Sequence, residues 1–74
     1  MMEVYFLNNE GEIKLIHLAK DSQDAQTAMN NYLEFNNYQK PRYFRYWLED
    51  EYTKCDFGSW SEFFLIKGDF INGL

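Results

Sequence analysis

Near the N-terminus of this 74-residue chain, Met2, Val4 and Phe6 alternate with Glu3, Tyr5 and Leu7, the two-residue period of a β-strand that has apolar residues on both faces. Residues 2–7 follow this pattern, and residues 12–18 are rich in strand-forming aliphatic side chains. Between them, the run Asn-Asn-Glu-Gly at 8–11 supplies residues that tolerate the backbone angles of a tight turn. The pattern therefore predicts a β-hairpin over residues 1–19.

The apolar period lengthens to that of a helix in the next segment. Five apolar residues recur at i, i+3, i+4, i+7 and i+8, which gives one apolar stripe: Ala25, Ala28, Met29, Tyr32 and Leu33. Asp21 or Ser22 is the expected N-cap, because both side chains can accept a hydrogen bond from the first turn. Pro41 cannot continue a helix. A helix is predicted over residues 22–36.

Strand-like alternation returns over residues 42–67 and predicts a three-stranded meander. Its strands are expected at 42–48, 52–57 and 60–67, with an acidic turn after the first and a Gly-Ser break before the last. Residues 68–74 are expected to form a short tail that partly packs on the core.

The element order β-β-α-β-β-β predicts a single small domain of the α+β class, with one helix packed on an antiparallel sheet. The sequence leaves open whether the hairpin and the meander join edge to edge in one sheet or form two small sheets.

Aromatic packing is the expected source of stability. Phe, Tyr and Trp make up 15 of the 74 residues, and each large ring can bury about 150–250 Å². Cys55 has no partner for a disulfide, and one cysteine with one histidine, His17, cannot complete a four-ligand zinc site. No cofactor or metal is expected.

The net charge of −5 makes nucleic acid an unlikely ligand, because non-specific binding depends on lysine and arginine neutralising phosphates. The stretch "RYFRYW" interleaves Arg with aromatic rings, but two arginines make a weak electrostatic attraction for a single strand. The same charge disfavours anionic membranes, and neither a signal peptide nor a membrane-spanning run is recognised. A cytoplasmic protein is expected.

Candidate catalytic groups lack the context that catalysis needs. Asp56-Phe57-Gly58 matches the metal-binding triplet of protein kinases, but the required glycine-rich loop, lysine and catalytic loop are missing. The triplet is expected to end a strand, with Phe57 inward and Gly58 at a bend. His17 and Cys55 lie in predicted strands without an orienting acid or an oxyanion site. The sequence therefore predicts a protein that is not an enzyme.

Large rings occur on both sides of the predicted meander, whereas one helix can cover only one side. The uncovered rings predict a protein-binding surface, because Tyr, Trp and Arg dominate interface energetics. Its expected anchors are Tyr43, Tyr46, Trp47 and Trp60. The acids expected to attract a basic partner are Glu49, Asp50, Glu51 and Glu62. The alternative is a homodimer that buries the aromatic face, and a small enzyme is the third hypothesis.

The size, element order, acidic charge and AT-rich residue usage resemble those of small accessory proteins of bacteriophages and mobile elements in low-GC Gram-positive bacteria. The ending "CDFGSWSEFFLIKG" is similar to the closing strands of such proteins. This resemblance implies binding to a host or defence protein whose activity is then altered. Some such inhibitors mimic DNA with a continuous anionic stripe, but the basic residues here are scattered along the chain, which argues against one.

Overall fold

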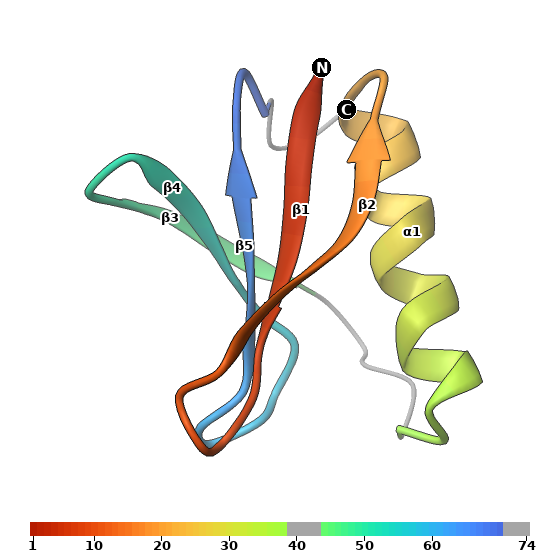
Figure 1. The fold of residues 1–74 in the computed structure, drawn as a ribbon, viewed down its shortest axis with the longest axis vertical. Helices are drawn as coiled ribbons and strands as arrows, with labels where there is room; N and C mark the ends of the chain where they lie inside the picture. The colour runs from red at the N-terminus through yellow and green to blue at the C-terminus, as the bar shows by residue number, and fades with distance from the viewer. Residues whose placement is uncertain (39–43, 71–74) are drawn as a thin grey trace.

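One helix packs on one face of a five-stranded antiparallel sheet in the computed structural model, which describes residues 1–38 and 44–70 (Figure 1). The strand order is β2-β1-β5-β4-β3. The elements are β1 (Met2–Leu7), β2 (Ile13–Ala19), α1 (Ser22–Phe35), β3 (Arg45–Glu49), β4 (Tyr52–Asp56) and β5 (Phe63–Lys67). The predicted α+β class and element order are confirmed.

The hairpin and the meander form a single sheet, because β1 pairs antiparallel with β5 from Glu3↔Lys67 to Leu7↔Phe63. The first strand of the chain and the last therefore lie side by side in the middle of the sheet (Figure 1). This answers the question that the sequence left open.

Strand β2 contains a bulge that changes which of its side chains share a face. Val4 pairs with His17 and Tyr5 pairs with Leu15, so Ile16 is an extra residue between the two pairs. As a result, Leu15 and Leu18 point to the same side of the sheet although they are three residues apart. His17 points to the opposite side, toward α1.

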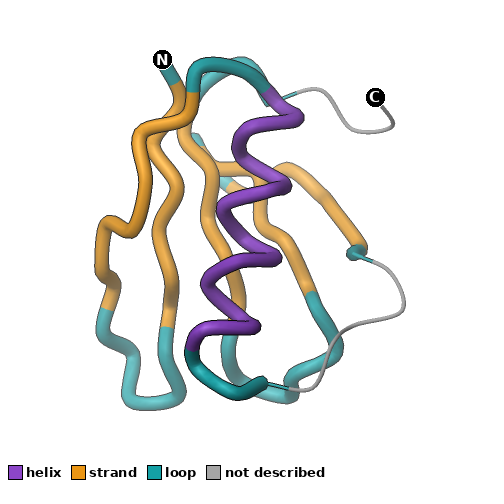
Figure 2. Tube along the Cα trace, turned by 90° about the vertical axis from the view of Figure 1, so that its right-hand side faces the viewer, coloured by secondary structure: helices purple, strands orange, loops and turns teal. Residues whose placement is uncertain are grey.

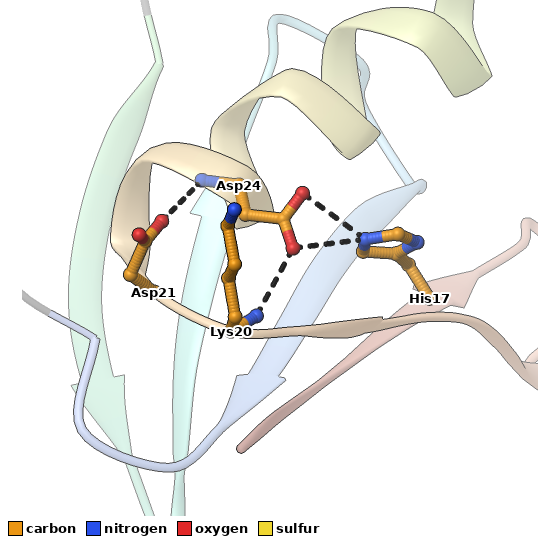
Figure 3. Close-up of polar contacts among 4 residues, drawn as sticks. All are labelled: His17, Lys20, Asp21 and Asp24. Carbon is orange, nitrogen blue, oxygen red and sulfur yellow. Dashed lines mark hydrogen bonds and ion pairs between the residues drawn. The ribbon is translucent and has the colours of Figure 1, made fainter.

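Polar contacts tie the start of α1 to the strand before it (Figure 3). The Asp21 carboxylate caps the helix by accepting from the Asp24 backbone N–H at 2.8 Å. The Asp24 carboxylate accepts from the Lys20 backbone N–H at 3.0 Å and lies 3.3 Å from Nε2 of His17. The Lys20 backbone bond first, and then the neighbouring His17, lower the pKa of Asp24.

The helix ends one residue earlier than predicted, at Phe35. Asn36 caps it, and Asn37 takes a left-handed conformation with φ of 62°. The Tyr38 backbone N–H then donates to the Leu33 carbonyl at 2.9 Å, which closes the last turn.

Aromatic rings fill the core between the helix and the sheet. The Phe64 ring is fully buried and lies 5.3 Å from the Phe6 ring centre, 5.3 Å from that of Phe57 and 6.0 Å from that of Tyr32. Buried residues of α1, including Met29, belong to the same cluster. This face of the sheet is a continuous core, as the aromatic composition led us to expect.

Strand β3 ends one residue later than predicted, at Glu49, whereas β4 and β5 are shorter than predicted, with the larger of these two differences before β5. The sequence predicts Trp60 at the start of the last strand, whereas Trp60 lies in the loop that precedes Phe63. The Ser59 hydroxyl accepts from the backbone N–H groups of Ser61 and Glu62 at 3.4 and 3.1 Å, so these amides bond to a side chain. Gly58, with φ of 100°, bends the chain just before.

Candidate protein-binding face

Helix α1 lies in front of one face of the sheet in Figure 2, and no other helix among the described residues covers the opposite face. We call it the helix-free face. Strand alternation and pairing place three residues of each strand on it: Glu3, Tyr5 and Leu7; Ile13, Leu15 and Leu18; Arg45, Trp47 and Glu49; Tyr52, Lys54 and Asp56; Phe63, Leu65 and Lys67.

Aliphatic side chains on strand β2 leave much of this face apolar and accessible to solvent. Ile13 is 56% exposed, Leu15 48% and Leu18 53%. They lie on an edge strand beside Tyr5 and Leu7 of β1, so their exposed surfaces are contiguous. Contiguous apolar patches of this kind mark interaction sites on soluble proteins.

An aromatic cluster occupies the other half of the face. The Trp47 and Phe63 rings meet edge to face with centres 6.3 Å apart, and Nζ of Lys54 lies 4.3 Å from the centre of the Phe63 ring. The Trp47 indole N–H donates to Glu49 at 3.2 Å. Trp47 is held in one orientation while 40% of it remains exposed, which suits an anchor for a partner.

The charges of the helix-free face are balanced within it. Arg45 donates to the Asp56 carboxylate at 2.6 Å, and Nζ of Lys54 lies 3.4 Å from a Glu49 oxygen. Three bases and three acids occupy the fifteen positions, so the formal charge of this face is zero on a chain of net charge −5. The Arg45 guanidinium and then the Gly58 backbone N–H lower the pKa of Asp56.

The four predicted anchors do not form one surface. Trp47 lies on the helix-free face. Tyr46 points to the opposite side, where its ring packs 4.8 Å from that of Phe70 and burial raises its pKa. Trp60 is 99% exposed in the β4–β5 loop, and Tyr43 lies outside the described residues.

Three of the four predicted acidic residues lie at the β3–β4 turn and the fourth directly precedes β5, and three of the four have partners within the chain. Glu49 pairs with Lys54, and Glu51 lies 4.0 Å from Nζ of Lys67. Glu62 accepts from the Tyr38 hydroxyl at 3.0 Å. Asp50 is exposed in the β3–β4 turn with φ of 56°. These partners reduce the field that the acids can present to a basic protein.

The three exposed aliphatic residues of β2 were not among the predicted site residues. A run of closely spaced aliphatic residues was visible, but its direction depends on the bulge at Ile16, which arises only when β2 pairs with β1. The run alone could equally have been buried.

The sheet order places His17 and Cys55 on strands that are not adjacent. His17 is on β2 and Cys55 is on β4, and strands β1 and β5 lie between them. At normal strand spacing, β2 and β4 are therefore about 14 Å apart. Cys55 is fully buried, and burial raises the pKa of its thiol to about 12. Such a thiol is a poor nucleophile at neutral pH.

Asp56-Phe57-Gly58 ends β4 as predicted. Phe57 is buried in the aromatic core, and the Asp56 carboxylate accepts from the Gly58 backbone N–H at 2.8 Å. The Asp56 carboxylate therefore stabilises the turn at Gly58 and pairs with Arg45. Across residues 1–38 and 44–70, no three His, Cys, Asp or Glu side chains gather in a way that could hold a metal ion.

A groove of about 430 Å³ runs between α1 and β2, beside the His17–Asp24 pair. Ile16, Ala28 and Tyr32 are among its lining residues, with Asn31 and Lys14 at its polar parts. The groove is open to solvent, and the pair within it fastens the helix to the strand (Figure 3). It lacks a positioned nucleophile among the described residues, so we do not assign chemistry to it.

Comparison with protein-family models, curated proteins and solved structures gave no significant match. In the described part of the chain, no helix has the length and apolar character needed to cross a membrane.

Proposed function

We propose that this chain is a non-enzymatic protein-binding module of the cytoplasm and that the helix-free face is its protein interface. The observation that carries the proposal is the contiguous apolar surface of Ile13, Leu15 and Leu18 on the β2 edge, on the same face as the partly exposed Trp47 ring of the opposite edge strand, β3. Covering it with protein removes that surface from water, at about 25 cal/mol per Å². Four of its six charged residues already pair within the face, Arg45 with Asp56 and Lys54 with Glu49, so these charges keep their partners when the face is covered.

A matched pair of variants tests the proposal. Leu15→Glu places a charge in the centre of the apolar surface. Leu48→Glu makes the same change on β3, at a leucine that is 82% exposed and points away from the helix-free face. Tagged wild-type and variant chains are immobilised and exposed to a lysate of the source cells supplemented with the untagged chain.

We expect the wild-type chain and Leu48→Glu to retain a protein that Leu15→Glu does not retain. Either a lysate protein or the untagged chain can be that protein. The proposal fails when Leu15→Glu retains everything that the wild-type chain retains. The resemblance to phage accessory proteins makes a host or defence protein the predicted external target, and mass spectrometry of the retained proteins examines that prediction.

A further inference from the structure

The helix-free face has the properties of a surface that meets a copy of itself. In a two-fold dimer the same patch occurs on both sides of the interface, so any net charge on it would repel its own image. Only a nearly neutral patch avoids this repulsion. The helix-free face is formally neutral, although the chain carries −5. A basic partner would instead favour an acidic face.

The size of the face also suits a dimer. Five strands spaced by about 4.8 Å, with five to seven residues each rising about 3.3 Å, give a face of roughly 24 by 20 Å. Two such faces, taken as flat, together bury on the order of 1,000 Å². The buried area is larger when the uneven surface formed by the side chains is included. About 1,000 Å² is the total above which an interface is credible as a biological one.

From these observations we infer that the occupant of the helix-free face is a second copy of this chain. The two sheets pack face to face with the helices outside, which makes a four-layer α/β/β/α dimer. A two-fold axis between the sheets and perpendicular to the strands lays β2 over β2 of the partner. The exposed aliphatic residues Ile13, Leu15 and Leu18 then meet their own counterparts.

Trp60 lies outside the strands that form this interface. It is 99% exposed in the β4–β5 loop, so burying the face does not require burying the whole Trp60 ring. This inference rests on the proposed function, since it names the partner of the same face.

Sedimentation equilibrium over roughly 1–200 μM tests the inference, the range in which a dimer of this interface size is expected to form. The wild-type chain should approach twice its mass of 9.0 kDa. Leu15→Glu should raise the dimer dissociation constant at least about 100-fold, because each copy would bury an unpaired charge. Leu48→Glu should leave the constant within about threefold of the wild-type value, because its position is outside the interface. Near-UV circular dichroism shows that each variant keeps its packed aromatic core.

A wild-type chain that stays at 9.0 kDa at 200 μM overturns the inference, and so does a dimer that Leu15→Glu leaves intact or that Leu48→Glu also disrupts. The proposed function is judged separately. If the chain is a monomer and Leu15→Glu abolishes retention of a lysate protein, the face is an interface with a different protein. If the chain is a monomer and retention is unchanged, both proposals fail.

Discussion

Phe63 and Phe64 are neighbours on β5 whose rings point to opposite faces of the sheet, so one substitution made at each compares the two faces. Phe64 is fully buried against three rings, whereas Phe63 is partly exposed and contacts Trp47 and Lys54. We predict that Phe64→Leu destabilises the folded chain by about twice as much as Phe63→Leu.

The magnitude follows from these contacts. Phe64→Leu loses three ring pairs worth about 0.5–1.5 kcal/mol each, and because they are not additive the expected cost is about 1.5–4 kcal/mol. Phe63→Leu loses one ring pair and one cation–π contact, at about 1–2 kcal/mol. A 74-residue domain has a total stability of roughly 4–11 kcal/mol, so both variants should still fold.

Urea unfolding, followed by tryptophan fluorescence and far-UV circular dichroism, measures both costs. The variants are compared at one low concentration, near 1 μM, because dimer dissociation adds a concentration-dependent contribution to stability. Equal costs, or a larger cost for Phe63→Leu, would show that the helix side is not the main core and refute the assignment of the two faces.

Three further predictions concern single positions. A β-carbon at Gly68 would lie 2.8 Å from Cγ of Met2, whereas one at Gly11 would meet open space, although φ is positive at both glycines. Gly68→Ala should therefore lower the urea midpoint of unfolding more than Gly11→Ala does. Equal shifts would mean that the close contact with Met2 is absent. Cys55 should react with Ellman's reagent at least about 1,000-fold more slowly in the native chain than in urea; stoichiometric labelling within minutes would contradict its burial. The Lys20 backbone N–H is the main cause that lowers the pKa of Asp24 below 3.8. The contribution of this carboxylate to stability is therefore present at neutral pH and lost as pH falls below about 4. Asp24→Asn should make the fall in stability between about pH 4 and pH 2 less steep, and an unchanged slope would contradict this.

Local signals account for what the sequence predicted correctly. The apolar stripe of α1 and the alternation in β1 each lie within one element. In both elements the buried residues recur with the period that the sequence shows. Tyr46 and Trp47 were predicted as anchors of one surface, whereas consecutive residues of a strand point to opposite sides of the sheet. Which of the two would point toward the helix depended on the sheet order, which no local pattern contains.

The features that the sequence did not predict come from contacts between elements or from one side chain. The pairing of β1 with β5 joins the two ends of the chain, and nothing in either strand specifies its neighbour. Trp60 lies in a loop because the Ser59 hydroxyl binds the next amides, which interrupts an otherwise strand-like pattern. The bulge at Ile16 turned Leu18 to the helix-free face, and that face is the surface on which the proposed function depends.

The distribution of charge separates self-association from attraction to a basic target. Three of the twelve acids and three of the seven bases lie on the helix-free face, so the other residues carry the whole net charge of −5. Two copies brought together repel through these outer charges, and salt screens the repulsion. We therefore predict that raising NaCl from 20 to 500 mM strengthens the dimer or leaves its dissociation constant within about twofold, since the buried face contributes no net attraction between charges. Binding of a basic protein at the exposed acid Asp50 would weaken steeply over the same range. A dimer that dissociates as salt rises would mean that charge pairs between the two copies hold the interface, which would contradict an interface held by the apolar surface of the helix-free face.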